Sequence, residues 1–401
     1  MQSAYPVKSP TARSSPPVST GTGLPTVAII GGGIIGLSLG WRLRQAGCPV
    51  TIFERGPLIG RGASWAAAGM LAAGIEAEPT EEPLFALGRW SQSLWPDFAA
   101  ELEAASGLPV GYEATGTLVC AFTRDQAEKL RHGIAFQRAI GGTFEWLNAA
   151  AAREREPGLA PNLVTAAFSP NDHQVDNRLV TTALAEAFRR VGGTLLTGIE
   201  ARIDISDGRA IGVVAGDRAH PADVTVLAAG AWSRGVPGLP AAFRPPVRPI
   251  KGQMLALRMP TGAPLIRHVV WGGQCYLVPR GDGRLLVGAT VEERGFDETI
   301  TAGGIYSLLD DAWRTLPGIE DLPIHETWVG FRPGSPDDQP ILGSSGIDGL
   351  VLATGHHRNG VLLTPATAAA LTELILTGRT NPRISPFSIR RFQPEKRDEH
   401  P

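Results

Sequence analysis

Three glycines near the N-terminus have the spacing of a phosphate-binding turn. Gly31, Gly33 and Gly36 form a GxGxxG pattern, and Glu54 follows the third glycine by 18 residues. The first glycine permits a tight turn, the second lets the backbone approach a pyrophosphate, and the third allows close packing of helix on strand. Glu54 can accept hydrogen bonds from both hydroxyls of an adenosine ribose. The pattern predicts dinucleotide binding, and the acid disfavours the 2′-phosphate of NADP.

A single arginine in the C-terminal half could bind a carboxylate. Arg332 ends an expected strand and precedes the rigid turn of "GFRPGSPDDQPILG" at 330–343. A fixed guanidinium can hold a carboxylate with two parallel N–H donors. The alternative is a surface arginine paired with Asp337 or Asp338. The rigid turn favours the first interpretation and leaves the second open.

A strand–helix–strand unit must position the glycines. Residues 26–30 are apolar and β-branched, residues 34–46 have helical periodicity, and residues 50–53 form a second apolar run. The run at 222–233 is typical of a buried parallel strand. About 150 residues between these parts do not continue the βαβ rhythm. An interrupted nucleotide domain of this kind favours a flavoprotein over a simple NAD-binding domain.

The run "GRGASWAAAGML" at 60–71 is rich in small residues. Such residues could let a helix N-terminus lie against an extended cofactor, with Ser64 capping the helix and binding a phosphate. An ordinary Ala-rich helix is the alternative.

The remaining pattern predicts further elements. Helices are expected at 84–105, 124–141 and 178–191, the last with Leu179, Ala183, Ala187 and Val191 on its apolar face. Strands are expected at 194–197, 199–205 and 210–215, with a hairpin turn at Asp207-Gly208. The strand-rich stretch at 246–331 predicts a second domain built on an antiparallel sheet. A strand, a glycine-rich loop and a helix that begins near Gly360 follow at 349–376.

Composition excludes several classes of protein. The 401 residues carry 37 Lys and Arg against 39 Asp and Glu, a balance that argues against a dedicated nucleic-acid binder. The three cysteines are far apart and odd in number, which indicates a reducing cytoplasm and no disulfide framework. No histidine spacing indicates a metal site, and no apolar run is long enough for a membrane span. We expect a disordered Ser/Pro-rich extension at 1–24 and a loose charged tail at 381–401.

In combination, the motifs resemble the D-amino-acid oxidase class of FAD-dependent oxidoreductases, and within it the glycine oxidases of the thiamine-biosynthesis type. The resemblance spans 26 to about 378 and is carried by "IIGGGIIG", "GASWAAAGML", "CYLVPRGDGRLLVGAT", "GFRPGSPDDQPILG" and "GHHRNGVLLTPATA". It implies an α/β fold with a glucose-oxidase-reductase-type FAD domain and a substrate domain on a mixed or antiparallel sheet. The implied FAD domain is discontinuous and comprises 25–84, 158–240 and 338–380. The implied substrate domain comprises 85–157 and 241–337.

The resemblance also implies roles for individual residues. Arg332 would anchor the substrate carboxylate, Tyr276 would add its hydroxyl, and Arg358 would be a second substrate contact. Gln274 and Val291 leave the width of the substrate pocket open. No cysteine follows the strand that ends at Phe331, where relatives attach flavin covalently, so FAD should be bound non-covalently. The implied cofactor contacts are Gly31, Gly33, Ile34, Ile35, Gly36, Glu54, Arg55, Ala63, Ser64, Ala68, Gly69, Met70, Ala201, His356, His357, Arg358, Asn359, Gly360, Val361 and Leu362.

The implied reaction is oxidative deamination of glycine, and of small relatives such as sarcosine, by hydride transfer to flavin. Its products would be the imine or glyoxylate, ammonia and hydrogen peroxide, and it would serve thiazole formation in thiamine biosynthesis. The partners would be a small amino acid and molecular oxygen, with a homo-oligomer possible. Two alternatives stay open: a D-amino-acid dehydrogenase that passes electrons to a quinone, and an FAD subunit of a sarcosine-oxidising or cyanide-producing complex.

Overall fold

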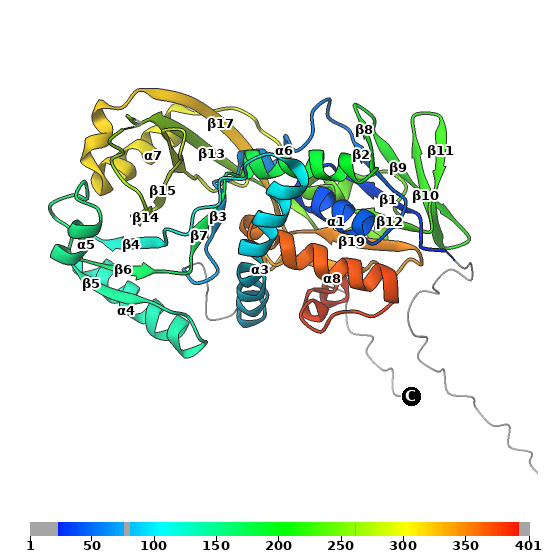
Figure 1. Ribbon diagram of the computed structural model, residues 1–401, viewed down its shortest axis with the longest axis horizontal. Helices are drawn as coiled ribbons and strands as arrows, with labels where there is room; N and C mark the ends of the chain where they lie inside the picture. Colours follow the sequence, from blue (N-terminus) through cyan, green and yellow to red (C-terminus); the bar gives the residue numbers. More distant parts are fainter. Residues whose placement is uncertain (1–22, 76–80, 261, 393–401) are drawn as a thin grey trace, which may run out of the picture.

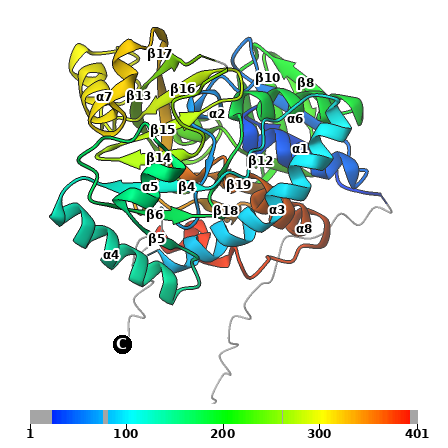
Figure 2. The ribbon, with the colours of Figure 1, turned by 60° about the vertical axis from the view of Figure 1, so that its left-hand side comes forward.

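The computed structural model describes residues 23–75, 81–260 and 262–392. Most of the expected N-terminal extension and the last nine residues of the expected tail lie outside the described residues. The chain forms two lobes, each built around one large sheet, and crosses between them several times (Figures 1 and 2). Because β1 begins the first lobe and β19 completes the same sheet near the C-terminus, neither lobe is contiguous in sequence.

The first lobe contains a six-stranded sheet in the order β18-β19-β12-β1-β2-β8. Its elements are β1 (Val27–Ile30), β2 (Val50–Glu54), β8 (Thr194–Thr197), β12 (Val224–Leu227), β19 (Leu350–Thr354) and β18 (Ile341–Ser344). All neighbours pair in parallel except β18, which pairs antiparallel with β19. The central strands are buried along their whole length because both faces of this sheet are covered.

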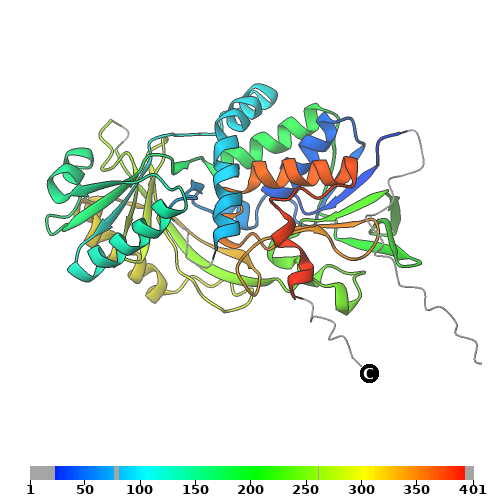
Figure 3. The ribbon, with the colours of Figure 1, turned by 90° about the horizontal axis from the view of Figure 1, so that it is seen from below.

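Helices cover one face of the six-stranded sheet (Figure 3). They are α1 (Ile34–Gln45), α3 (Glu82–Ser106), α6 (Asn177–Arg190) and α8 (Thr364–Thr377). A three-stranded antiparallel sheet packs on the opposite side of the strands, formed by β9 (Ala201–Ser206), β10 (Arg209–Ala215) and β11 (Arg218–Pro221). The expected turn between β9 and β10 is present, with positive φ at both Asp207 and Gly208, as a tight hairpin requires.

The second lobe contains an eight-stranded sheet in the order β17-β13-β16-β15-β14-β4-β6-β5. Its strands are β4 (Thr117–Ala121), β5 (Glu145–Asn148), β6 (Thr165–Ser169), β13 (Arg248–Arg258), β14 (Val269–Gly272), β15 (Cys275–Pro279), β16 (Arg284–Gly288) and β17 (Ile324–Gly334). One pair, β14 with β4, is parallel, so the sheet is mixed. Helix α7 (Ala302–Thr315), which the strand-rich pattern at 246–331 did not predict, packs on it through Leu308 and Ala312. Two further helices, α4 (Arg124–Ala139) and α5 (Ala149–Arg155), complete this lobe.

Two short segments connect the lobes. Helix α2 (Ala63–Ala66) leads into β3 (Met70–Leu71), which pairs antiparallel with β7 (His173–Gln174). The alternative of an Ala-rich helix across 60–71 is therefore wrong. The helix has only four residues, and the chain is extended by Met70 because it pairs there with Gln174.

Several other expectations need correction. Leu179 does not lie on the buried face of α6: it is 40% exposed, while Val180, Leu184 and Phe188 pack into the core. Asp176 caps this helix through the backbone N–H groups of Arg178 and Leu179, which fixes where its first turn starts.

Two boundaries also differ. Strand β6 pairs with β4 and β5, so placing all of 158–240 in the FAD domain is wrong for this strand, and we propose that the boundary falls after Ser169. The segment 381–392 is not a loose tail, because Phe387 and Ile389 are buried and Arg391 forms an ion pair with Asp337. In the described parts of the chain, no helix combines the length and apolar character needed to cross a bilayer.

Candidate functional site

A long cavity of about 920 Å³ lies between the two lobes. One end is lined by the β1–α1 turn and by the residues that follow β2, and the other end by strands of the eight-stranded sheet. The segment from Gly60 to Met70 and the turn before α8 line its length. A cavity with these walls can hold an extended ligand that reaches from the glycine-rich turn to Arg332.

The glycine-rich turn lies against the cavity. Gly31 has φ of +114°, and a Cβ there would lie 2.4 Å from the carbonyl oxygen of Ala228. Gly33 precedes α1 and carries no side chain that could cap the helix. The expected cap by Ser64 on its own helix is wrong, because Ser64 lies inside α2 and Gly62 precedes it. The Ser64 hydroxyl instead accepts a hydrogen bond from the N–H of Ile34, at 2.9 Å, which joins α2 to the first turn of α1.

Glu54 is held at the carboxyl end of β2. Its two carboxylate oxygens accept hydrogen bonds from the N–H groups of Gly32, at 2.9 Å, and Gly56, at 2.8 Å. The neighbouring Arg55 lies over the ring of Trp232, 4.3 Å from its centroid. Both residues line the cavity together with Ala201.

At the other end of the cavity Arg332 presents a guanidinium group. It lies on β17 beside Gly252, where a Cβ would come within 2.7 Å of its Nη1. Nη1 donates to the carbonyl oxygen of Thr290 at 3.0 Å and, more weakly, to that of Lys251 at 3.5 Å. In the described residues, Nε and Nη2 make no hydrogen bond and the group makes no ion pair within 4.0 Å. A planar pair of N–H donors therefore remains for a ligand.

The alternative of a surface arginine paired with a neighbouring acid does not hold for the described residues. Asp337 is bound by Arg391 through two hydrogen bonds, at 2.7 and 3.0 Å. Asp338 lies instead near His357, with 3.9 Å between its Oδ1 and Nδ1 of the imidazole.

Tyr276 lines the same end of the cavity. It stands on β15 opposite Gly288, and its hydroxyl lies 3.9 Å from the sulfur of Met254. Its ring packs against Trp271, with 5.2 Å between the centroids. Gln274, Val291 and Met254 line this end as well, so an aromatic wall and the guanidinium of Arg332 bound the space there.

The turn before α8 brings two histidines to the cavity. Burial lowers the pKa of His356 to about 3, and its Nε2 lies 3.1 Å from the hydroxyl of Thr367. Burial also lowers the pKa of His357 to about 3, with a further contribution from the nearby guanidinium groups of Arg332, Arg358 and Arg248. Both imidazoles are therefore neutral near pH 7. Arg358 lines the cavity but also forms an ion pair with Glu81 at 3.2 Å.

Three expected cofactor contacts do not line the cavity, namely Gly36, Asn359 and Leu362. Gly36 serves packing, since a Cβ there would lie 2.0 Å from the carbonyl oxygen of Gly31. The carbonyl of Leu362 accepts hydrogen bonds from Ser91 and Trp95 of α3 instead. The expected helix start near Gly360 is also wrong, because α8 begins at Thr364 after a short 3₁₀ turn.

Trp232 and Asp338 are among the cavity residues that the sequence analysis missed. Trp232 follows the expected strand at 222–233, but a lone tryptophan after a strand carries no specific signal. Asp338 has φ of +53°, and its Oδ1 is buried with no hydrogen-bond partner in the described residues. Burial raises its pKa. Asp338 is thus a carboxyl group close to His357 that the spacing of motifs did not place in the site.

The geometry fits a flavin dinucleotide. A tight turn that requires glycine at position 31, an acid at the end of β2 and a long cavity extending to a second sheet are the features that such a cofactor needs. The family model described as "FAD dependent oxidoreductase" matches residues 26–374. The chain therefore belongs to the DAO family of FAD-dependent oxidoreductases, and it is a flavoenzyme of the α/β class.

Individual relatives are similar over nearly all of the chain. The "Bifunctional protein ThiO/ThiG" of Trichormus variabilis is 38% identical over 92% of this chain, which spans only 55% of that longer protein. The "Glycine oxidase" of Geobacillus kaustophilus is 37% identical over 91% of this chain and 96% of its own length. The crystal structure of glycine oxidase from the same organism has a TM-score of 0.85 at 36% identity, covering 92% of this chain and 99% of that one.

Proposed function

We propose that this enzyme oxidises glycine, and small relatives such as sarcosine, to the imine, which hydrolyses to glyoxylate with release of ammonia from glycine or methylamine from sarcosine. The observation that carries the proposal is Arg332, a guanidinium inside the cavity with two N–H donors unused within the described residues. The names of the glycine oxidase relatives support it. The name of the bifunctional relative supports a place in thiamine biosynthesis.

Bound FAD would supply the acceptor of the hydride and, with oxygen, the route to hydrogen peroxide. The residues of the chain would bind and orient the substrate. Arg332 would hold the carboxylate with a bidentate pair of hydrogen bonds, and Tyr276 would donate a further one. Fixing one end of a two-carbon molecule restricts where its Cα–H can lie, and proximity of this kind supplies much of the rate.

No protein base is needed for this scheme. The two imidazoles at the cavity are neutral, but His356 is engaged with Thr367 and we assign it to packing. We propose that a substrate amine without its extra proton assists departure of the hydride. We assign Arg358 a secondary contact with substrate, weakened by its ion pair with Glu81.

The separate, buried cysteines agree with a reducing compartment, and we propose the cytoplasm. None of the three lines the cavity, so we propose that FAD is held without a covalent bond to cysteine.

An anaerobic screen of flavin bleaching tests this function. Glycine, sarcosine, D-alanine, L-alanine and D-proline are mixed separately with the enzyme, and flavin absorbance is followed. We expect glycine and sarcosine to bleach the flavin fastest. Bleaching by the larger amino acids alone would refute the assignment, and peroxide release in air with no added quinone decides between oxidase and dehydrogenase.

A further inference from the structure

Side chains on the side away from the cavity donate hydrogen bonds to the backbone carbonyls of most residues from Ser64 to Gly69. The side of this segment toward the cavity includes Ser64, Ala66, Ala68 and Gly69. On the other side, Asn177 donates to the carbonyls of Ser64 and Trp65, at 2.7 and 3.1 Å. The indole N–H of Trp328 donates to the carbonyl of Ala66, at 3.0 Å. Such regular bonding fixes the backbone that borders the cavity.

Arg280 makes the shortest of these contacts. It directly follows β15 and is only 6% exposed, so the guanidinium has left water almost completely. Its Nη2 donates to the carbonyl of Ala68 at 2.6 Å, and its Nη1 donates to the side chain of Gln174 at 2.7 Å. Gln174 in turn pairs with Met70 across the β3–β7 ladder. Arg280 thereby holds the extended segment both directly and through the strand beside it.

Gly69 is required for this contact. Its φ is +69°, and a Cβ there would lie 2.0 Å from the carbonyl oxygen of Val175 and 2.8 Å from Nη2 of Arg280. The N–H of Val175 donates to the carbonyl of Gly69 at 2.9 Å. The backbone can approach the guanidinium only because this position lacks a side chain.

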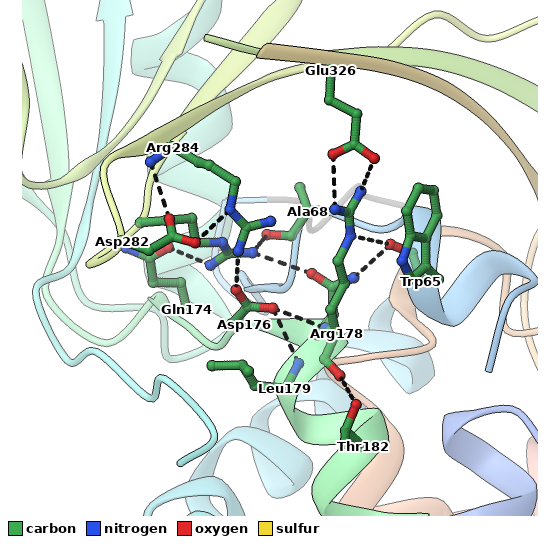
Figure 4. Close-up of polar contacts among 12 residues, drawn as sticks. Trp65, Ala68, Gln174, Asp176, Arg178, Leu179, Thr182, Asp282, Arg284 and Glu326 are labelled. Carbon is green, nitrogen blue, oxygen red and sulfur yellow. Dashed lines mark hydrogen bonds and ion pairs between the residues drawn. The ribbon is translucent and has the colours of Figure 1, made fainter. Parts of the chain in front are cut away.

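The charge of Arg280 is balanced only without direct contact, by the carboxylates of Asp176, Glu113 and Asp282, each of which raises the pKa of the guanidinium. Its acceptors are a backbone carbonyl and two side-chain amides, including Asn177 at 3.2 Å. In the described parts of the chain it has no ion pair within 4.0 Å. The nearby carboxylate of Asp176 is bound by Arg284 at 2.6 Å and caps α6 (Figure 4). A buried cation whose counter-ions make no direct contact with it is costly, and its charge or geometry can serve function.

Other arginines near this segment are paired. Arg178 donates to the carbonyl of Trp65 and forms an ion pair with Glu326 at 2.9 Å (Figure 4). Its guanidinium also lies 3.7 Å from the ring centroid of Trp65. Burial lowers the pKa of Arg280 to about 10, which still leaves it charged at neutral pH, and its Nε is buried with no hydrogen-bond partner in the described residues.

We propose that Arg280 is a positioning residue that fixes the flavin-facing backbone of Ala68–Met70 and directs a positive charge through it toward the flavin. Two-electron reduction adds negative charge to the cofactor. A cation held in a low-dielectric interior stabilises that charge more strongly than one in water. Arg280 therefore raises the reduction potential of the bound FAD without touching the substrate. The inference rests on FAD binding by the family fold and not on the identity of the amine.

The test compares Arg280→Met, Arg280→Lys and the control Arg258→Met. Arg258 lies on the same sheet and donates to the carbonyl of Asp282, at 2.9 Å, but it does not line the cavity. The midpoint potential of bound FAD is measured by equilibration with a reference dye, and FAD affinity by titration, so no amine substrate is involved. In Arg280→Met the equilibrium constant for flavin reduction should fall at least tenfold, which is about 30 mV for a two-electron couple.

Arg280→Lys keeps the charge but loses the planar fork, and should lie between wild type and Arg280→Met. Arg258→Met should match the wild type. The proposal would be overturned if the equilibrium constant for flavin reduction in Arg280→Met lay within threefold of the wild-type value. Equal midpoint potentials in the Lys and Met variants would overturn it as well. If Arg280→Met does not retain FAD, Arg280→Lys decides: a wild-type potential refutes the role. If neither variant folds, Arg280 has a structural role and the assignment to the flavin is wrong.

Discussion

Replacing Arg332 with alanine should weaken carboxylate binding roughly 100-fold. Nε and Nη2 of Arg332 have no acceptor in the described residues, so a bound carboxylate can gain two charge-assisted hydrogen bonds. At about 1.5 kcal/mol each, their loss costs about 3 kcal/mol, and each 1.4 kcal/mol is a factor of ten. Because the glycine-rich turn and Glu54 lie at the opposite end of the cavity, the variant should retain FAD.

The assay is an anaerobic titration of the flavin spectrum with acetate, followed by measurement of kcat/KM for glycine. Arg332→Lys should recover part of the affinity, because it keeps the charge but not the planar fork. Arg244→Ala serves as the matched control, since Arg244 donates to the carbonyl of Leu239, at 3.2 Å, and does not line the cavity. An Arg332→Ala enzyme that holds its flavin and binds acetate within threefold of wild type would show that the carboxylate lies elsewhere.

The remaining predictions concern the cofactor, the base and pH. Acid precipitation of the yellow protein should leave all flavin in the supernatant, and flavin that stays with the pellet would contradict non-covalent binding. His356→Ala, His357→Ala and Asp338→Asn, each with FAD bound, should still be reduced by glycine in stopped flow, whereas loss of reduction in any of them would identify a required base. The rate of flavin reduction should rise with pH as the substrate amine loses its proton, and a flat profile with α-deuterated glycine showing a full isotope effect would count against that. Burial lowers the pKa of His356 to about 3, whereas an exposed histidine has a pKa near 6.5. Between pH 3 and pH 6.5, His356 is therefore protonated in the unfolded chain but not in the folded chain. The free energy of unfolding should therefore fall as pH drops from about 6.5 toward 3, and His356→Phe should reduce that slope in urea titrations.

The first lobe could be predicted well from local patterns. The βαβ unit appears where the periodicity of residues 26–53 indicates, and the strand at 224–227 pairs in parallel as its apolar run suggests. These elements are encoded locally, since a buried parallel strand is apolar throughout and a glycine pattern fixes the turn beside it. The face of α6 was harder, because periodicity allowed Leu179 or Val180 to point inward. Val180 points inward because it packs against core residues that are distant from it in the sequence.

The site could be predicted only in part. Arg332 and Tyr276 line one cavity, but the sequence could not place Asp338 beside His357, because that proximity depends on two turns of positive φ at separate points of the chain. The assignment of 381–392 to a tail failed for a related reason. Its charged residues suggested an exposed segment. In the structure Phe387 is buried, and Arg391 donates a hydrogen bond to Asp337, which lies 54 residues earlier.

The interleaved order of the two large sheets sets when this protein can fold during its synthesis. Strand β1 must pair with β12, and β12 with β19, so the six-stranded sheet is complete only when residues near 350 have emerged from the ribosome. Until then β12 presents an open edge, which is a template for wrong pairing with other chains. Such distant pairings slow folding, because chain entropy is lost before the contacts form. Nascent chains therefore expose this edge until β19 has been made, and a cell making this enzyme quickly has to protect them from aggregation until then.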